Sequence, residues 1–430
     1  MQPILVVGGD MRTHAIVLKL LMEGRKVICT PGNGGIFADP RVVRGKVKAD
    51  DHAGLVELAR ATGALTIVGP EGPLVAGIGD KFAAAGLSFV GPFKDGASIE
   101  GSKAGCCELL MEAGVPIPRF KIFTDASDAI RYLGKAEFPL VIKADGLCSG
   151  KGVRIVKNFV EAAKAIEDFM VVKVFGEAGA TIVIQEFLVG PELSMFAFVD
   201  SSGFALYTIL SQDHKTVGNA NTGPMTGGMG AIAPVPFARE ELRQQIIKTI
   251  FEPTLATGAR QGALFQGVLY AGLKVTSSGP CVLEFNCRPG DPETEVVLPL
   301  LKTPLGDILE AIPTGDLNRI GPLQWHDGSA CIVVMAAENY PDKPVTGDVI
   351  NGLNECGQLA VVPDHPGQID DLHGGTECED GVWKTAGGRV IGARCRAATH
   401  PLAVEGAYKG VHQVSWRGEK HREDIGAYAN

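Results

Sequence analysis

Residues 143–153 read Lys-Ala-Asp-Gly-Leu-Cys-Ser-Gly-Lys-Gly-Val, and this stretch decides the fold. The apolar run 138–142 before it predicts a short buried strand that ends at Lys143, and the run 153–156 predicts a second strand. The glycines between the strands let backbone N–H groups approach a ligand closely. A hairpin carrying Lys143 and Lys151 can therefore fold over a polyphosphate. Taken alone, the stretch is equally compatible with an ordinary surface hairpin.

Composition and charge limit the class of protein. The chain has 430 residues, of which 45% are hydrophobic and 21% are charged, values that are ordinary for a globular protein. This length predicts about three domains. The net charge of −9 lacks the basic footprint that nucleic-acid binding requires, so we expect no nucleic-acid partner. No apolar run approaches about 18 residues, so we expect no membrane span.

The cysteines and the first residues indicate the compartment. The ten cysteines contain no CxxC pair, and several lie inside apolar runs. This pattern favours reduced, buried thiols over a disulfide framework or structural zinc. The N-terminus lacks the basic segment of a signal peptide and enters an apolar strand at once. We therefore expect a cytoplasmic protein. Separately, we expect small-molecule partners and either a monomer or a homodimer.

Strands and helices alternate over about the first 95 residues and predict an open parallel α/β sheet. Strands are expected at 4–7, 27–29, 65–68 and 88–90, and helices from Arg12 onward, at 53–61 and at 74–85. Ligands bind at the carboxyl ends of such strands, so Gly8, Gly9 and the loop 31–35 should face one crevice. GxGxxG is absent, which argues against a nicotinamide nucleotide. A helix start carrying Arg12 still suits a phosphate monoester or a carboxylate.

The rest of the chain divides into two further regions. We expect domains at 1–100 (N-terminal α/β), 101–324 (central, two subdomains, with the hairpin near 143–156) and 325–430 (C-terminal α+β). Central helices are expected at 102–113 with Ser102 as N-cap, 125–134, 158–170, 238–257 and 293–313, and strands at 120–123, 181–187, 193–199, 204–210, 267–275 and 281–285. C-terminal strands are expected at 330–336, 358–362 and 390–393, followed by a helix near 401–412. The glycine-rich segment 218–230 is too long for a turn, and loops of that length are usually functional.

Glu284 and Asn286 form a candidate metal site. Alternation along the expected strand places both side chains on one face, with Phe285 on the other. A carboxylate and an amide oxygen suit Mg²⁺, which binds a few hard oxygens together with phosphate oxygens. Arg288 would share this polar face if the strand continued. A polar strand end without a ligand is the alternative interpretation.

Two other polar clusters fit a nucleotide and a substrate. Glu186 ends an apolar strand, and the backbone at 187–188 can hydrogen-bond the edge of an adenine. Glu192, after a Gly-Pro turn, can accept from ribose hydroxyls, although an exposed strand end would look the same. The segment Ser211-Gln-Asp-His-Lys215 places five polar residues directly after a strand and near the glycine-rich segment. Its histidine alone would more often be structural than catalytic, but the cluster favours a substrate site.

The order of these signals is that of ATP-grasp enzymes. Nearly the whole chain resembles the phosphoribosylamine–glycine ligase (glycinamide ribonucleotide synthetase) family. The matching stretches are Val68–Gly77, Glu100–Lys103, Lys143–Leu147, Gly150–Val153, Ser211–Lys215, Thr222–Pro224, Thr226–Ala231, Glu284–Asn286, Gly290–Thr294, Thr385–Val390 and Asp424–Gly426.

The resemblance implies an α/β ATP-grasp fold, preceded by an N-terminal open parallel α/β domain and followed by a C-terminal α+β lobe. It also implies a ligase that uses ATP and Mg²⁺, or Mn²⁺ in its place. The glycine carboxylate would attack the γ-phosphate of ATP to give an acyl phosphate. The amine of 5-phosphoribosylamine would then displace phosphate and give glycinamide ribonucleotide, a purine precursor. The substrates are thus an amino acid and a phosphosugar amine.

The resemblance also implies roles for individual residues. The catalytic residues would be Arg288, Lys143 and Asp213, and the metal ligands Glu284 and Asn286. The ATP-binding residues would be Lys103, Lys143, Gly150, Lys151, Glu186, Phe187, Leu188 and Glu192. The substrate-binding residues would be Gly8, Gly9, Arg12, His14, His214, Lys215, Gly223 and Asp291.

The chain departs from the family's pattern near these sites. The unusual residues are Asp10, Met11 and Thr13 in the first loop, Thr216 for arginine, Asn219 for aspartate, Met225 for asparagine, Pro289 for phenylalanine and Glu295 for glutamine. Changes at polar positions alter which groups a site can bind. One alternative is therefore a paralogous ATP-grasp ligase that joins a different amino acid or amine. Another is a non-catalytic nucleotide-binding protein, which would not require the pair Glu284 and Asn286.

Overall fold

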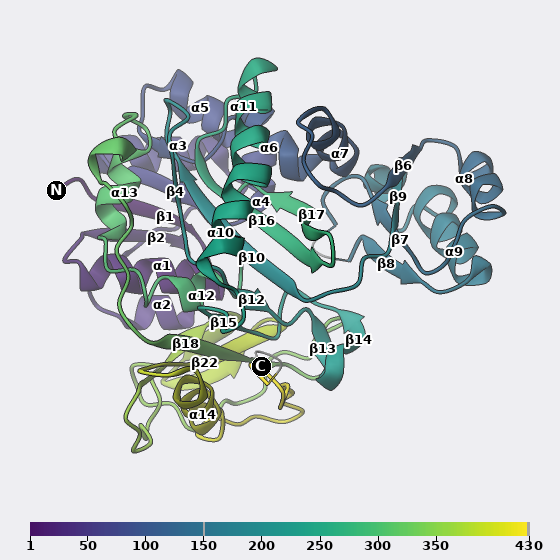
Figure 1. Ribbon diagram of the computed structural model, residues 1–430. Coiled ribbons are helices and arrows are strands. Elements are labelled where there is room, and N and C mark those ends of the chain that lie inside the picture. The colour runs from purple at the N-terminus through teal and green to yellow at the C-terminus, as the bar shows by residue number, and fades with distance from the viewer. Residues whose placement is uncertain (149–150, 428–430) are drawn as a thin grey trace.

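The computed structural model describes residues 1–148 and 151–427. The N-terminal sheet and the C-terminal sheet belong to one main body, and residues from about 118 to 186 project from it as a separate lobe (Figure 1). Gly150, which the sequence predicts to bind ATP, lies outside the described residues.

The N-terminal sheet is parallel throughout, which confirms the expected open α/β arrangement. Its strands, in the order β3-β2-β1-β4-β5, are β3 Val42–Arg44, β2 Val27–Pro31, β1 Ile4–Gly8, β4 Leu65–Val68 and β5 Phe89–Val90. The helices around it are α1 Met11–Met22, α2 Gly34–Ala38, α3 His52–Thr62, α4 Glu71–Val75, α5 Ile78–Ala84 and α6 Lys94–Gly101. Strand order reverses at β1, so the loops after β1, β2 and β4 meet at the crevice where such sheets bind ligands.

Two expected helices are each broken in two, so the single-helix predictions are wrong. The helix expected at 74–85 splits into α4 and α5 because Gly77, with φ +82°, adopts the left-handed conformation between them. The helix expected at 293–313 splits into α12 (Thr294–Val297) and α13 (Leu305–Ala311). Pro304 is the N-cap residue of α13, and it keeps that helix from extending backward because proline disfavours helical geometry at the residue before it.

The projecting lobe contains the lysine hairpin. Its antiparallel sheet has the order β6-β9-β7-β8, and its strands are β6 Phe120–Phe123, β9 Ile182–Glu186, β7 Leu140–Ala144 and β8 Val153–Val156. The helices are α8 Ala126–Leu133 and α9 Phe159–Ile166, which continues as a π-helical turn at Glu167–Val171, and a 3₁₀ turn follows at Gly176–Gly179. Strands β7 and β8 pair with Lys143 opposite Val153, as the hairpin prediction requires.

A second antiparallel sheet faces this lobe. In the order β11-β10-β16-β17 its strands are β11 Ala205–Tyr207, β10 Glu192–Val199, β16 Gly267–Thr276 and β17 Gly279–Asn286. Helix α7 Lys103–Glu112 begins at Ser102, whose side chain caps it as expected. The helix expected at 238–257 is α10 Glu240–Ile246, a π-helical turn Ile247–Phe251 and α11 Glu252–Arg260 in succession.

The C-terminal sheet draws two strands from the central part of the chain. In the order β12-β15-β18-β22-β19 its strands are β12 Gln212–Asp213, β15 Gly230–Ala233, β18 Ser329–Ala336, β22 Arg389–Ala397 and β19 Gln368–His373. The remaining elements are the hairpins β13 Thr216–Gly218 with β14 Thr222–Met225 and β20 Thr376–Glu379 with β21 Val382–Thr385, 3₁₀ turns at Asn219–Asn221 and Leu317–Arg319, and α14 His400–Val411. The sheet thus crosses the expected boundary near residue 325, and the three-domain division stays a prediction.

The strand expected at 358–362 is wrong. These residues form a loop, with a single bridge between Leu353 and Leu359. The apolar pair Val361 and Val362 that indicated a strand is exposed instead. Among residues 1–148 and 151–427, no helix has both the length and the apolar character that crossing a bilayer demands.

The N-terminal core should be sensitive to truncation of Phe82. This side chain is fully buried and packs against Phe89, with ring centroids 5.0 Å apart. Phe82→Ala should lower the free energy of unfolding by about 3–5 kcal/mol, because it leaves a cavity. The matched change Phe204→Ala, at a side chain that is 43% exposed, should cost about 1 kcal/mol or less. Urea unfolding midpoints check this, and equal shifts for the two variants would contradict the packing described.

Candidate active site

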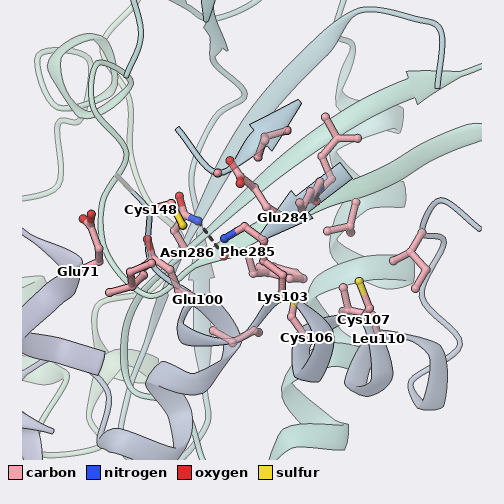
Figure 2. Close-up of a pocket in the computed structure, with 18 of the residues that line it drawn as sticks. Glu71, Glu100, Lys103, Cys106, Cys107, Leu110, Cys148, Glu284, Phe285 and Asn286 are labelled. Carbon is pink, nitrogen blue, oxygen red and sulfur yellow. Dashed lines mark hydrogen bonds between the residues drawn. The ribbon is translucent and has the colours of Figure 1, made fainter. Parts of the chain in front are cut away.

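One cavity lies between the projecting lobe and the sheet that faces it. Lys143 of β7 and Glu284 of β17 both line it. The Lys143 Nζ donates to the backbone carbonyl of Leu283 at 2.8 Å, so the two strands are in direct contact. The cavity has a volume of about 630 Å³, and it shares these residues with an adjoining pocket of about 130 Å³. Figure 2 shows that pocket, with Lys103 and Asn286 also on its wall.

The lysine hairpin is tied to the start of α7. Lys103 is the first residue of that helix, and its Nζ lies 3.5 Å from the carbonyl of Gly146 in the hairpin turn. The Asp145 carboxylate accepts from the Ser102 hydroxyl at 3.1 Å and from the Ala104 backbone N–H at 2.7 Å. Helix start and hairpin therefore present their two ammonium groups to the same pocket. Sequence spacing of 40 residues gave no indication of this contact.

Glu284 is held in its ionised form. Burial alone would raise its pKa, but Lys215, Lys143 and Lys103 outweigh this and lower the pKa to about 2. The Lys215 Nζ is 3.4 Å from the Glu284 carboxylate. In turn, burial lowers the pKa of Lys143, and Glu284 opposes that shift. An ionised carboxylate is the form that can bind a divalent cation.

Asn286 extends the same polar face. Its side chain follows Glu284 on β17 with Phe285 between them, and Phe285 points the other way to pack against Phe251. The Asn286 Nδ2 donates to the backbone carbonyl of Phe285 at 2.8 Å, so the amide oxygen is the atom available to a ligand. Within the described ranges, no three His, Cys, Asp or Glu side chains converge as a ready-made metal site.

The opposite end of the cavity suits a nucleoside. Its apolar wall consists of Pro118, Val141, Ile155, Phe187, Leu188 and Leu283. Glu186 lies at its edge and pairs with Arg119, whose Nε is 2.7 Å and whose backbone N–H is 2.8 Å from the carboxylate oxygens. Glu192 lines the cavity next to Lys274, at 3.1 Å. The exposed side chain of Lys151 completes this edge.

Arg288 is fixed between two carboxylates that sequence reasoning did not select. Its Nη2 is 3.2 Å from Glu100 and its Nε is 3.5 Å from Glu71. Burial of the guanidinium opposes its charge, but these two acids raise its pKa well above the usual value. Glu100 also accepts from the backbone N–H of Cys287 at 2.8 Å, which holds the carboxylate in place. Both glutamates lie within stretches that match the family pattern, and that was the available signal.

A mixed-charge group forms the far end of the cavity. Its members are Asp10, Arg12, Asp213, Lys215, Asp291, Glu293, Tyr340 and Arg389. Burial, together with Glu293, raises the pKa of Asp213 well above its usual value. The Glu293 carboxylate accepts from the Ser194 hydroxyl at 2.8 Å, and that hydroxyl is 3.0 Å from the Tyr270 hydroxyl. Arg389, Tyr340 and Tyr270 were missed because they come from strands and loops remote in sequence.

Several expected substrate residues lie outside the cavity wall. They are Gly8, Gly9, His14, His214 and Gly223. His14 is buried, and its Nδ1 accepts from the backbone N–H of His373 at 2.9 Å. His214 is also buried, and its Nε2 accepts from the backbone N–H of Gly426 at 3.3 Å. Burial lowers the pKa of His214 to about 4, so it is neutral. Both histidines connect the main body to the C-terminal segments.

The unusual first loop neutralises Arg12 internally. Asp10 caps α1 by accepting from the backbone N–H of Thr13 at 2.8 Å and from its hydroxyl at 2.6 Å. The same carboxylate pairs with Arg12, which also donates to the backbone carbonyl of Pro289 at 2.7 Å. The departures at positions 10 and 13 therefore act together, and they hold the arginine that the sequence indicated for a phosphate.

The variant Asp10→Asn should show how much this ion pair contributes to the free energy of unfolding. Burial would raise the pKa of Asp10, but Arg12 and Thr13 lower it from 3.8 to about 2. A lowered pKa stabilises the fold above the unfolded-state value, and this contribution disappears as pH falls toward 2. Asn keeps the helix cap, so Asp10→Asn should cost about 2 kcal/mol at pH 7, with the cost shrinking below pH 4.

The control is Asp51→Asn, at an exposed cap of α3 that accepts from the backbone N–H of Gly54 at 2.9 Å. This change should alter the free energy of unfolding by about 0.5 kcal/mol or less at either pH. Denaturant unfolding measured at pH 7 and pH 3 tests both variants. A cost for Asp10→Asn that is the same at both pH values would rule out the ion-pair explanation.

Comparison with known proteins matches all three regions of the chain. Models of phosphoribosylglycinamide synthetase match its N domain at residues 2–100, its ATP-grasp (A) domain at 101–294 and its C domain at 330–428. Among similar proteins, the phosphoribosylamine–glycine ligase of Caldanaerobacter subterraneus is 40% identical, over 99% of each chain. That of Allochromatium vinosum is 41% identical, over 98% of this chain and 97% of the other. The trifunctional purine biosynthetic protein adenosine-3 of Gallus gallus is 39% identical, over 98% of this chain and 42% of its own length.

Solved structures agree with this assignment. The phosphoribosylamine–glycine ligase of Thermotoga maritima superimposes with a TM-score of 0.81 at 28% identity, covering 98% of this chain and all of that one. The biotin carboxylase domain of the Hydrogenobacter thermophilus 2-oxoglutarate carboxylase has a TM-score of 0.72 at 17% identity, covering 98% and 92%, and shares the fold. The expected ATP-grasp architecture is therefore confirmed, and the chain belongs to the phosphoribosylglycinamide synthetase family of ATP-dependent ligases.

Proposed function

We propose that the protein joins glycine to 5-phosphoribosylamine and produces glycinamide ribonucleotide, ADP and phosphate. The observation that carries this proposal is that Lys143, Glu284 and Asn286 line one cavity with Arg288. A phosphate-binding lysine, a metal pair and an anion-binding arginine are the groups that activation of a carboxylate by ATP requires. Relatives at about 40% identity over the full length carry the name of this activity.

ATP would lie along the length of the cavity. Its adenine fits the apolar wall at Phe187 and Leu188, where the backbone offers hydrogen bonds to the base. Glu192 is placed to accept from the ribose hydroxyls. The phosphates would then reach Lys143, Lys103 and Lys151, which are point charges on three separate segments. Glu186, although held by Arg119, lies at the adenine end of this path.

Glu284 and Asn286 fit a divalent cation, Mg²⁺ or Mn²⁺. The carboxylate is ionised, because its pKa is about 2, and the amide nitrogen of Asn286 is used by the backbone. Two protein oxygens are few for Mg²⁺, which commonly completes its shell with substrate phosphates and water. The cation would supply neutralisation of the charge on the triphosphate. The set of donors therefore suits a metal that arrives with the nucleotide.

The remaining residues position and neutralise the reacting groups. The carboxylate of glycine attacks the γ-phosphate, and Arg288, fixed by Glu71 and Glu100, stabilises the negative charge of the acyl phosphate. The amine of phosphoribosylamine then attacks the acyl carbon, and phosphate leaves. Asp213, whose raised pKa is due mainly to burial, is suited to accept the proton that this amine releases.

One observation supports a different amino acid or amine as the substrate. Met225 lines the cavity at a position where the family has asparagine, so a thioether replaces a polar contact. In contrast, Thr216 accepts from Arg422 Nη1 at 3.0 Å, and Asn219 accepts from the backbone N–H of Glu423 at 3.0 Å. These two departures thus contact the C-terminal segment. The alternative of another amino acid or amine therefore rests mainly on Met225.

The same proposal also bears on the cellular compartment and the oligomeric state of the protein. All ten cysteines are free, and seven of them are buried, which suits a reducing compartment. The proposed substrates are free small molecules, so we propose that the enzyme works in the cytoplasm. A monomer or a homodimer is compatible with the cavity, because the residues named above all come from one chain.

Glu284→Gln should slow the reaction strongly with every substrate. The amide is nearly the same size but removes the negative charge that balances Lys143 and Lys215 and would bind the cation. We expect ADP release with glycine and freshly generated phosphoribosylamine to fall by about 10²–10³-fold. The exposed Glu241→Gln on α10 serves as the control and should keep full activity. Activity that survives in Glu284→Gln would place the metal elsewhere.

A substrate panel separates the proposed reactions. ADP release is measured with glycine and phosphoribosylamine, and then with other amino acids and other amines. Turnover that requires both purine precursors supports the proposed function. Turnover only with another pair supports the paralogous ligase, and ATP binding without turnover on any pair supports a nucleotide-binding protein.

A further inference from the structure

The stretch Asp424–Gly426 matches the family pattern, but the reaction described above gives it no role. It belongs to residues 422–426, which we call the C-terminal segment. Arg422 begins this segment, and its side chain is completely inaccessible to solvent. A guanidinium stays charged inside a protein, so its burial requires a hydrogen-bond acceptor for each of its N–H groups. Those acceptors show what the segment holds in place.

All five N–H groups of Arg422 have an acceptor. Nε and Nη2 donate to the two carboxylate oxygens of Asp424, at 2.7 and 2.8 Å. Nη1 donates to the Thr216 hydroxyl at 3.0 Å and lies 3.3 Å from the Thr216 carbonyl oxygen. Both Nη atoms donate to the side-chain oxygen of Asn221 at 3.2 Å. Arg422 therefore connects the C-terminal segment to the first strand and to the turn of the β13–β14 hairpin.

The turn of this hairpin is strained. Ala220 and Asn221 both have a left-handed backbone conformation, with φ of +54° and +56°, which residues with a Cβ rarely adopt. The Asp424 carboxylate accepts from the backbone N–H of Ala220 at 2.7 Å. The Asn219 side-chain oxygen accepts from the backbone N–H of Glu423 at 3.0 Å. The C-terminal segment thus supplies contacts that hold this turn, and such strain persists only where the surrounding structure imposes it.

The C-terminal segment is itself anchored to α14. The Tyr408 hydroxyl of that helix donates to the carbonyl of Arg422 at 2.8 Å and accepts from the backbone N–H of Ile425 at 2.9 Å. Helix α14 in turn packs against β18 and β22 of the C-terminal sheet. The hairpin is therefore held against a part of the molecule that has its own core.

The second strand of the hairpin leads into the wall of the cavity. Met225, Thr226 and Gly227 all line the cavity. The carbonyl of Gly227 accepts from Arg389 Nη1 at 2.7 Å, so this segment also orients a cation of the mixed-charge group. The carbonyl of Lys215 accepts from the Thr226 backbone N–H at 2.7 Å and from its hydroxyl at 2.9 Å, so Lys215 has a separate support. Movement of the hairpin would therefore alter the far end of the cavity first.

We propose that Arg422 is a positioning residue, which holds the β13–β14 hairpin so that residues 225–227 shape the far end of the cavity for the phosphosugar amine. This inference rests on the proposed function for the identity of that substrate. Arg422 acts only through the hairpin, because its guanidinium is occupied by Asp424, Thr216 and Asn221. The proposed adenine site at Phe187 and Leu188 lies at the opposite end of the cavity.

The kinetic test uses Asn221→Gly, which removes one acceptor of Arg422 and relieves the strained φ at the same residue. Glycine adopts this conformation freely, so the melting temperature should stay within about 3 °C of the parent value. The KM for phosphoribosylamine should rise about tenfold because the hairpin is less well held, while the KM for ATP stays within about twofold. An unchanged KM for phosphoribosylamine, or an equal rise for ATP, would overturn the proposal.

The matched control is Asp380→Gly. Asp380 has a φ of +49° in the exposed turn between β20 and β21, so this change relieves the same kind of strain at a different hairpin and should alter neither KM. Arg422→Lys keeps a positive charge beside Asp424 and should recover part of the affinity that Arg422→Met loses. If these two variants do not fold, Asn221→Gly decides.

Amide hydrogen exchange tests the positioning without any substrate. In the ligand-free protein, residues 216–226 should exchange about tenfold faster in Asn221→Gly than in the parent, because fewer contacts hold the hairpin closed. Asp380→Gly should leave the exchange of these residues unchanged. Unchanged exchange at 216–226 in Asn221→Gly would overturn the inference, whatever the substrate.

The two measurements separate this inference from the proposed function. Faster exchange together with an unchanged KM for phosphoribosylamine would show that Arg422 has a structural role alone, and would overturn the positioning role. If the parent enzyme does not turn over glycine and phosphoribosylamine, the proposed function fails. The KM test then uses the substrate pair that the panel identifies, and a rise for that amine in Asn221→Gly would still support the positioning role.

Discussion

The structure depends on the ionised Glu284 between cations that arrive from separate segments. Lys143 comes from the projecting lobe, Lys103 from the start of α7, and Lys215 from the loop after β12. A carboxylate buried without these partners would take up a proton, and the buried Lys143 would lose its proton more readily without Glu284. Each side therefore keeps the other charged, and the sheet that carries Glu284 and the lobe that carries Lys143 must face each other. The cavity is the space that this balance leaves between them.

A similar balance of charges holds the arginines that line the cavity. Arg288 is held by Glu71 and Glu100, and Arg12 by Asp10, so each arginine that faces the ligand space is fixed by acids behind it. Such charges are oriented before a substrate arrives, and little reorganisation is needed as charge develops in the reaction. The supporting acids come from α4, α6 and the loop before α1, which explains why the N-terminal sheet must sit against the sheets that carry Lys143 and Glu284.

Local sequence patterns predicted the helices and strands, but they did not predict the contacts between distant segments. The hairpin around Lys143, the parallel strands near the N-terminus and the Ser102 cap follow from periodicity and turn chemistry over a few residues. The break at Gly77 was missed because its left-handed conformation is visible only in the backbone. Arg389 joins the site from a strand 98 residues beyond Asp291, whose backbone carbonyl it contacts, and no periodicity in a single sequence encodes that pairing.

The residues that depart from the family pattern fall into groups with different consequences. Asp10 accepts a hydrogen bond from Thr13 and pairs with Arg12. Thr216 and Asn219 accept hydrogen bonds from the C-terminal segment. These changes therefore preserve charge balance within the protein. Met225 alters the cavity wall itself, and Glu295 places a second buried acid near Asp291. Burial and the neighbouring Asp291 raise the pKa of Glu295 well above its usual value. The departures thus lie both in the wall of the cavity and behind it, where a side chain alters the charge balance of its neighbours.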